Sequence, residues 1–170
     1  MVIWIAGLSG AGKSTIGKLV WDRLRERTPN VVLLDGDELR AVFGGAIGHD
    51  PEARRQQSIR IGNLCRLLDR QGVHVVCCAV TIAPEVQASS RQELSGYFEV
   101  FLDVSLDVLK KRDPKGIYAR AARGEVKNLA GVDIPYQAPQ HPHLVIENNT
   151  ARTDLSELAR RILDASGLHR

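Results

Sequence analysis

Apolar runs of strand length alternate along this chain with segments whose apolar residues recur every three or four positions. The runs at residues 2–6 and 31–34 contain no polar residue, which predicts strands buried on both faces of a parallel sheet. Further strands are predicted at residues 73–80, 97–104 and 144–146. Strands that alternate with helices predict an α/β fold with a five-stranded parallel sheet between helices.

Helix boundaries follow from capping residues and helix breakers. The first helix should stop at Thr28-Pro29, and a long one should begin with Asp50 as N-cap and continue to about Arg70. Ser105 should cap another helix. Shorter helices are expected after residues 38 and 84 and at 155–165, and a proline-rich loop at 132–142.

Composition limits the class of protein. With 170 residues, 44% of them hydrophobic, the chain should form one domain over residues 1–170. A net charge of +3 is too balanced for a protein that coats nucleic acid. Three cysteines without a Cys-x-x-Cys pair suit a reducing compartment, and no apolar stretch approaches the roughly 20 residues that span a bilayer. We therefore expect a cytoplasmic protein with no nucleic-acid and no membrane partner.

Residues 7–14 match the phosphate-loop pattern G-x-x-x-x-G-K-[S/T] at every specified position. The loop lies between a predicted strand and a predicted helix, where backbone N–H groups and the helix N-terminus attract phosphate. Lys13 would reach the β- and γ-phosphates, and Ser14 would hold Mg²⁺. The residues expected to bind ATP are Ser9, Gly10, Ala11, Gly12, Lys13, Ser14 and Thr15.

Two carboxylates follow the second predicted strand. Asp35 suits a direct or water-mediated Mg²⁺ contact, and Asp37 suits orientation of an acceptor hydroxyl. With Lys13 they form the expected catalytic set. The alternative is that either aspartate only caps the following helix.

Residues 110–131 have a basic character, and the segment 110–127 lacks a wide apolar face. Beside a phosphate loop, such a segment predicts a lid that closes over polyphosphate, with Arg112 among the residues on ATP. The alternative is a solvated surface helix. A lid that excludes water suits a kinase for a small molecule, and the absence of an Asn-Lys-x-Asp motif disfavours a GTPase.

Nearly the whole chain resembles the adenylylsulfate (APS) kinase family. The motifs are GLSGAGKST (7–15), LDGDxLR (34–40), RIG (60–62), FEVFLD (98–103), RDPKGIY (112–118), GEVK (124–127), GVD (131–133) and PY (135–136). The resemblance implies transfer of the ATP γ-phosphoryl group to the ribose 3′-hydroxyl of adenylylsulfate, giving PAPS for sulfate assimilation. It also implies a homodimer. The residues that it places on the nucleotide acceptor are Asp37, Arg40, Arg54, Val80, Thr81 and Lys115.

The departures from the family pattern fall around the acceptor base. His49 replaces a Phe, Gln57 replaces an Asn, and Asn128-Leu129 replaces Gly-Phe, so two aromatic faces are lost. The alternative acceptor is therefore a smaller, polar pyrimidine, as in the related cytidine diphosphoramidate kinases of capsule biosynthesis. Hydrogen bonds from His49, Gln57 and Asn128 would then replace stacking. A non-catalytic nucleotide-binding regulator is the remaining alternative.

Overall fold

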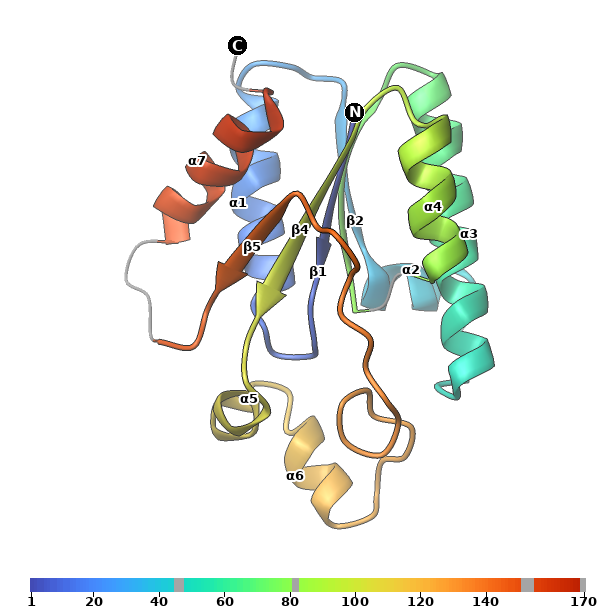
Figure 1. The fold of residues 1–170 in the computed structure, drawn as a ribbon, viewed down its shortest axis with the longest axis vertical. Helices are drawn as coiled ribbons and strands as arrows, with labels where there is room; N and C mark the ends of the chain where they lie inside the picture. The colour runs from blue at the N-terminus through green and yellow to red at the C-terminus, as the bar shows by residue number, and fades with distance from the viewer. Residues whose placement is uncertain (45–47, 81–82, 151–154, 169–170) are drawn as a thin grey trace.

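The computed structural model describes residues 1–44, 48–80, 83–150 and 155–168. They form one parallel sheet in the order β2-β3-β1-β4-β5 (Figure 1). The strands are β1 (Val2–Ala6), β2 (Val31–Asp35), β3 (His74–Ala79), β4 (Tyr97–Asp103) and β5 (Leu144–Glu147). The predicted α/β fold with a five-stranded parallel sheet is confirmed.

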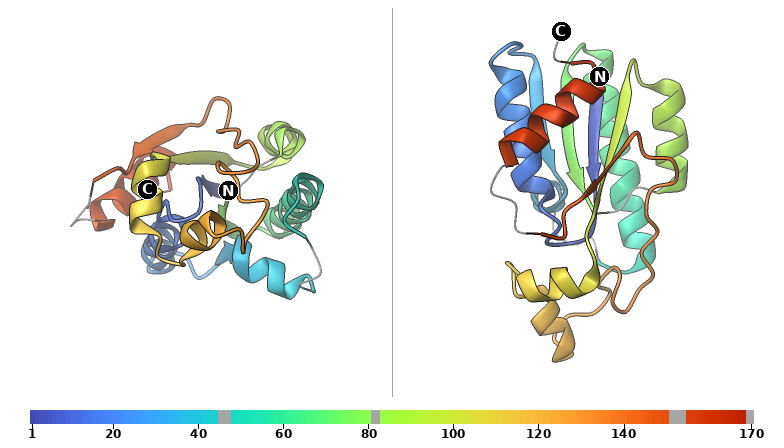
Figure 2. Two further views of the ribbon diagram at one scale, coloured as in Figure 1. Left: turned by 90° about the horizontal axis from the view of Figure 1, so that it is seen from below. Right: turned by 60° about the vertical axis from the view of Figure 1, so that its left-hand side comes forward.

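Helices cover both faces of the sheet. On one face lie α1 (Lys13–Arg25) and α7 (Leu155–Ser166), and on the other lie α3 (Pro51–Arg70) and α4 (Pro84–Glu93) (Figures 1 and 2). The short helices α2 (Gly36–Val42), α5 (Leu106–Arg112) and α6 (Ile117–Ala122) lie at and beyond the carboxyl ends of the strands. None of the described helices is long and apolar enough to cross a membrane.

β1 is the central strand, and its side chains belong to two separate cores. Ile3 and Ile5 pack into the core on the α1 and α7 side, whereas Val2, Trp4 and Ala6 pack into the core on the α3 side. All five residues have no exposed surface. Because both faces of β1 are fixed by packing, the loop that leaves its carboxyl end starts from a rigid point, at the place where the strand order reverses direction.

The prediction that the strand at residues 31–34 is buried on both faces is only partly right. Val31 is buried, but the rest of β2 is half-exposed. The reason is its place at the edge of the sheet, where β3 is its one neighbour. An unbroken apolar run in the sequence does not distinguish a central strand from an edge strand.

Helix caps show one success and one error of the sequence analysis. Asp50 caps α3 as predicted, because its Oδ1 accepts a hydrogen bond from the backbone nitrogen of Ala53 at 3.0 Å, and the helix ends at Arg70. Ser105 stands at the N-cap of α5, but its side chain makes no capping hydrogen bond. Its backbone N–H instead donates to Asn149 Oδ1 at 2.8 Å, which ties the start of α5 to the segment after β5.

Gly17→Ala should destabilise the protein through one defined clash. A Cβ at Gly17 would lie 2.2 Å from Cys78 Sγ, so α1 would have to move away from β3. Overpacking of this kind costs about 1–3 kcal/mol, more than the gain in helix propensity of up to about 1 kcal/mol. We expect a lower midpoint of urea unfolding. The double variant with Cys78→Ala, which removes the sulfur, should recover most of the loss; no recovery would contradict the packing.

Candidate active site

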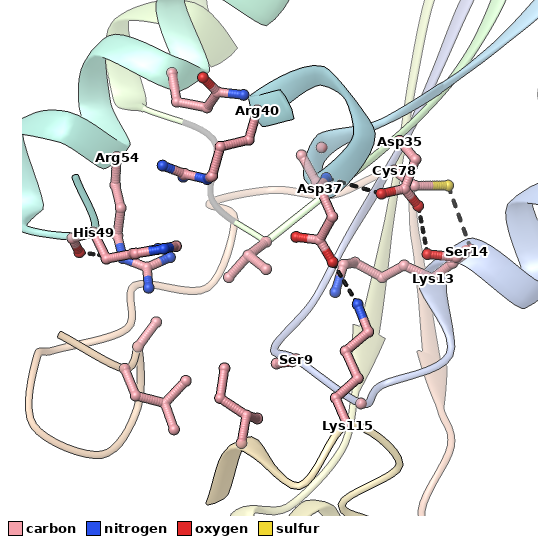
Figure 3. Close-up of a pocket in the computed structure, with 18 of the residues that line it drawn as sticks. Ser9, Lys13, Ser14, Asp35, Asp37, Arg40, His49, Arg54, Cys78 and Lys115 are labelled. Carbon is pink, nitrogen blue, oxygen red and sulfur yellow. Dashed lines mark hydrogen bonds and ion pairs between the residues drawn. The ribbon is translucent and has the colours of Figure 1, made fainter. Parts of the chain in front are cut away.

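A cavity of about 530 Å³ opens at the carboxyl edge of the sheet. Its walls come from the phosphate loop, the starts of α2 and α3, the end of β3, the turn after α5, and residues 129–130. This volume lies within the usual range for small-molecule sites, about 300–1,000 Å³. Segments that are distant in the sequence therefore meet at one site (Figure 3).

The phosphate loop has its carbonyl oxygens bonded from outside. Tyr118 of α6 donates its hydroxyl to the Ser9 carbonyl at 2.8 Å, and Asn148, after β5, donates Nδ2 to the Ala11 carbonyl at 3.0 Å. Both donors are buried. With these carbonyls turned outward, the backbone amides of the loop are available to an anion in the cavity.

Left-handed glycines give the loop its shape. Gly10 has φ 81° and Gly12 has φ 96°, a backbone conformation that L side chains rarely adopt. Gly12 also forms the N-cap of α1 without a side-chain cap. The first amides of α1 therefore have no side-chain oxygen from the cap, which suits a bound phosphate.

Lys13 is held within the loop. Its Nζ donates to the Leu8 carbonyl at 2.9 Å, and its own carbonyl accepts from Cys78 Sγ at 3.3 Å. Burial lowers the pKa of Lys13 to about 8; the charge of Lys115 adds to this effect, and the charge of Asp37 counteracts part of it. A buried amine with a lowered pKa is stabilised as a cation by an anionic ligand.

Asp35 has two partners. Its Oδ1 caps α2 by accepting the Asp37 backbone N–H at 2.9 Å, and its Oδ2 accepts the Ser14 hydroxyl at 2.5 Å. Asp35 therefore caps α2, but capping is not its only contact, because its other carboxylate oxygen faces Ser14. Among the described residues no group of three or more His, Cys, Asp and Glu could hold a metal. One carboxylate and one hydroxyl suit Mg²⁺, which keeps waters and phosphate oxygens as its other ligands.

Asp37 extends into the cavity and forms an ion pair with Lys115 (Figure 3). Burial alone would raise the pKa of Asp37, but the hydrogen bond and charge of Lys115, together with Lys13 and Arg40, lower it. The side chain is therefore ionised at neutral pH. It can accept a hydrogen bond from a hydroxyl group and so orient it.

The other half of the cavity is cationic. Arg54 donates from Nε to the His49 carbonyl at 2.9 Å and from Nη2 to the Asn128 carbonyl at 2.7 Å, and Arg40 donates to the Gly48 carbonyl at 2.7 Å. These backbone bonds hold both guanidinium groups at the cavity wall. Burial, and then the charges of Arg40 and Arg54, lower the pKa of His49, so its imidazole is neutral at pH 7.

Gln57 is a buried polar residue in this wall. Its exposed fraction is 5%, and neither Oε1 nor Nε2 has a hydrogen-bond partner among the described residues. A buried amide without partners costs free energy that a ligand with a donor and an acceptor would recover. Gln57 could therefore offer a polar contact to a molecule in this half of the cavity.

Most residues predicted for the site line this one cavity, and a few do not. Those that line it are Ser9, Gly10, Gly12, Lys13, Ser14, Thr15, Asp35, Asp37, Arg40, His49, Arg54, Gln57, Val80, Lys115 and Leu129. Ala11 and Asn128 lie behind the lining and contribute carbonyl oxygens to its supports. Arg112 is not part of the lining; it donates to the Thr150 carbonyl at 3.0 Å. Thr81 lies outside the described residues.

Two supporting residues were missed by the sequence analysis. Tyr118 stands within a quoted motif, RDPKGIY, but no role was assigned to it. Asn148 follows β5, 137 positions beyond the Ala11 carbonyl that it bonds, and no pattern in the sequence links the two. The basic segment 110–127 is not one continuous helix: it contains the end of α5, a turn at residues 113–116 and the helix α6.

Comparisons with known proteins agree on one family. A family model described as adenylylsulphate kinase matches residues 1–147. The adenylyl-sulfate kinase of Gloeothece citriformis is 40% identical over 158 residues, which are 93% of this chain and 87% of that protein. The cytidine diphosphoramidate kinase of Campylobacter jejuni is 33% identical over 162 residues, 95% of this chain and 94% of that protein.

A solved structure gives the same result for the fold. The APS kinase of Mycobacterium tuberculosis, in complex with AMPPNP and APS, is similar to this chain with a TM-score of 0.84 and 33% sequence identity. The match covers 96% of this chain and 95% of that one. The family is therefore shown at the level of both sequence and fold.

The lowered pKa of Lys13 predicts a pH-dependent affinity for nucleotides. Bound phosphate should raise this pKa again, so the free protein must take up a proton on binding above pH 8. The affinity for Mg-ADP should therefore fall about tenfold by pH 9, one unit above the pKa of the free protein. Isothermal titration calorimetry from pH 7.5 to 9 measures this. In Lys13→Arg, whose side chain stays charged, the affinity for Mg-ADP should not change between pH 7.5 and 9. The same decrease with pH in this variant would show that Lys13 is not the group that titrates.

Proposed function

This chain belongs to the adenylylsulfate kinase family, whose members are ATP-dependent kinases, and we propose that it phosphorylates the ribose 3′-hydroxyl of adenylylsulfate to give PAPS. One observation carries the proposal. The phosphate loop with Lys13 and the carboxylate of Asp37 line the same cavity, and Lys115, which also lines it, forms an ion pair with Asp37. A donor phosphate and an acceptor hydroxyl can therefore be held side by side.

The donor half consists of residues that bind and neutralise polyphosphate. The amides of the phosphate loop and the Lys13 ammonium would hold the β- and γ-phosphates of ATP. Ser14 and Asp35 would hold Mg²⁺, which neutralises phosphate charge when it is bound. We propose these roles from the geometry of the loop and from the resemblance together.

In the acceptor half, Asp37 would accept a hydrogen bond from the 3′-hydroxyl and aim it at the γ-phosphorus. Its lowered pKa makes it a weak base, so its main effect is orientation of the hydroxyl. Arg40 and Arg54 would face the phosphosulfate group. Lys115, beside Asp37, would stabilise charge that develops on the transferred phosphoryl group.

We propose that residues 110–131 form the lid. The segment contains the end of α5 and all of α6, and its residues Lys115, Ile117 in α6, Leu129 and Ala130 line the cavity. A lid at this place would exclude water, so that the alcohol attacks instead of solvent. We also propose that two copies of the chain form a homodimer in the cytoplasm. Light scattering of the purified protein would measure the oligomeric state.

Cytidine diphosphoramidate is the second candidate acceptor. The observation that favours it is the unpartnered amide of Gln57, which lines the same cavity as the neutral imidazole of His49. The described part of the lining contains no Phe or Tyr. A small polar base would use these hydrogen-bonding groups, whereas adenine would use stacking surface. The 33% identity to the Campylobacter jejuni kinase adds support.

Asp37→Asn should abolish most of the transfer and leave donor binding intact. The amide keeps the shape but loses the charge that orients the hydroxyl, so we expect kcat to fall by about 10²-fold or more. The Kd for Mg-ADP should change by less than threefold. Undiminished kcat would refute the role of Asp37. Loss of Mg-ADP binding would mean that the carboxylate supports the donor side instead.

Acceptor choice is tested by comparing kcat/KM for adenylylsulfate and for cytidine diphosphoramidate with Mg-ATP. The proposal predicts a higher kcat/KM for adenylylsulfate. Leu129→Phe, which restores an aromatic face, should raise kcat/KM for adenylylsulfate about five- to tenfold through stacking and should change the cytidine value less. If kcat/KM is higher for the cytidine compound, and if Gln57→Leu reduces that value, cytidine diphosphoramidate would replace adenylylsulfate as the proposed acceptor. Binding of Mg-ADP without any transfer would support a regulator.

A further inference from the structure

The turn between α5 and α6 is held rigidly by one carboxylate. Asp113, with φ 25°, accepts hydrogen bonds from the backbone nitrogens of Tyr118 at 3.1 Å and Ala119 at 2.9 Å. Its own backbone N–H donates to the Leu109 carbonyl at 2.8 Å, and its carbonyl accepts from Gly116 at 2.9 Å. The backbone of the turn is therefore held in one shape, so the main-chain positions of Lys115 and Tyr118 are set relative to each other.

This turn lies against the phosphate loop. Tyr118 is 5% exposed, and its hydroxyl donates to the Ser9 carbonyl at 2.8 Å. A Cβ placed on Gly10 would lie 3.5 Å from Leu109 and 3.6 Å from Pro114, so the loop backbone lies close to the last part of α5 and to the start of the turn. The lid and the donor loop thus share a packed interface that includes the partly buried hydrogen bond from Tyr118 to Ser9.

Lys115 projects from the same turn to the acceptor side. It stands three positions before Tyr118 and forms the ion pair with Asp37 (Figure 3). Tyr118 contacts the donor loop, and Lys115 contacts the acceptor carboxylate. Any displacement of the turn from the phosphate loop would consequently move the Lys115 ammonium relative to both Lys13 and Asp37.

We propose that Tyr118 is a positioning residue, which seats the lid on the phosphate loop and thereby sets the place of Lys115 between donor and acceptor. The proposal rests on the proposed kinase function for its effect on transfer. Its effect on the donor loop does not depend on any acceptor. Tyr118 has two actions in this account: it holds the Ser9 carbonyl away from the cavity, and it holds the turn that carries Lys115.

The test compares Tyr118→Phe with Tyr136→Phe. Both variants remove one buried hydroxyl and keep the ring, but the Tyr136 hydroxyl has no hydrogen-bond partner among the described residues and Tyr136 is not in the cavity lining. Loss of one neutral hydrogen bond should weaken Mg-ADP binding about three- to tenfold in Tyr118→Phe and leave it unchanged in Tyr136→Phe. Equal affinities in the two variants would overturn the proposal.

The link to Lys115 is tested by a double-mutant cycle on kcat with Lys115→Met. In the wild-type background Tyr118→Phe should lower kcat by at least threefold; in the Lys115→Met background it should have little further effect, because the group that it positions is gone. Equal factors in both backgrounds, or a parallel loss of melting temperature, would make Tyr118 merely structural. If the wild-type protein transfers to neither acceptor, the proposed function fails, whereas the Mg-ADP comparison still decides whether Tyr118 holds the donor loop.

Discussion

The phosphate loop can present its amides to a ligand because its carbonyl oxygens are bonded from outside. Three donors from other elements do this: the Cys78 thiol at the end of β3, the Asn148 amide after β5 and the Tyr118 hydroxyl of α6. The Lys13 ammonium, from within the loop, bonds a fourth carbonyl, that of Leu8. The shape of an eight-residue motif therefore depends on the whole sheet, and above all on β1, which starts the loop from a strand that is buried on both faces.

The two halves of the cavity both carry cationic side chains, but these side chains are supported in different ways. On the donor side, burial lowers the pKa of Lys13, so this lysine gains most from an anionic ligand. On the acceptor side, backbone carbonyls hold the Arg54 guanidinium in place, and Gln57 remains a buried amide without partners. The donor side follows the pattern of its family, whereas the acceptor side carries the substitutions. We infer that this chain uses the same phosphoryl donor as its family and that it differs from the family in the part of the site that binds the acceptor base.

The fold and the donor loop could be predicted from local sequence because both leave local signals. Apolar runs locate strands, Asp50-Pro51 locates the start of α3, and the phosphate-loop pattern locates the loop between β1 and α1. Three features could not be predicted, because each depends on contacts made only after the chain has folded. They are the position of β2 at the edge of the sheet, the lack of a capping hydrogen bond from the Ser105 side chain, and the hydrogen bond from Asn148 to the phosphate loop. Gln57 was predicted from its difference to the family; its lack of partners is visible only in three dimensions.

The most direct test of the central claim identifies the atom that receives the phosphoryl group. The protein is incubated with Mg-ATP and adenylylsulfate, and the product is analysed by two-dimensional ¹H–³¹P NMR. The account predicts one new phosphomonoester whose phosphorus couples to the ribose H3′ proton, formed in equal amount to ADP. A phosphorus coupled to any other ribose proton, or ADP formed with inorganic phosphate alone, would contradict it.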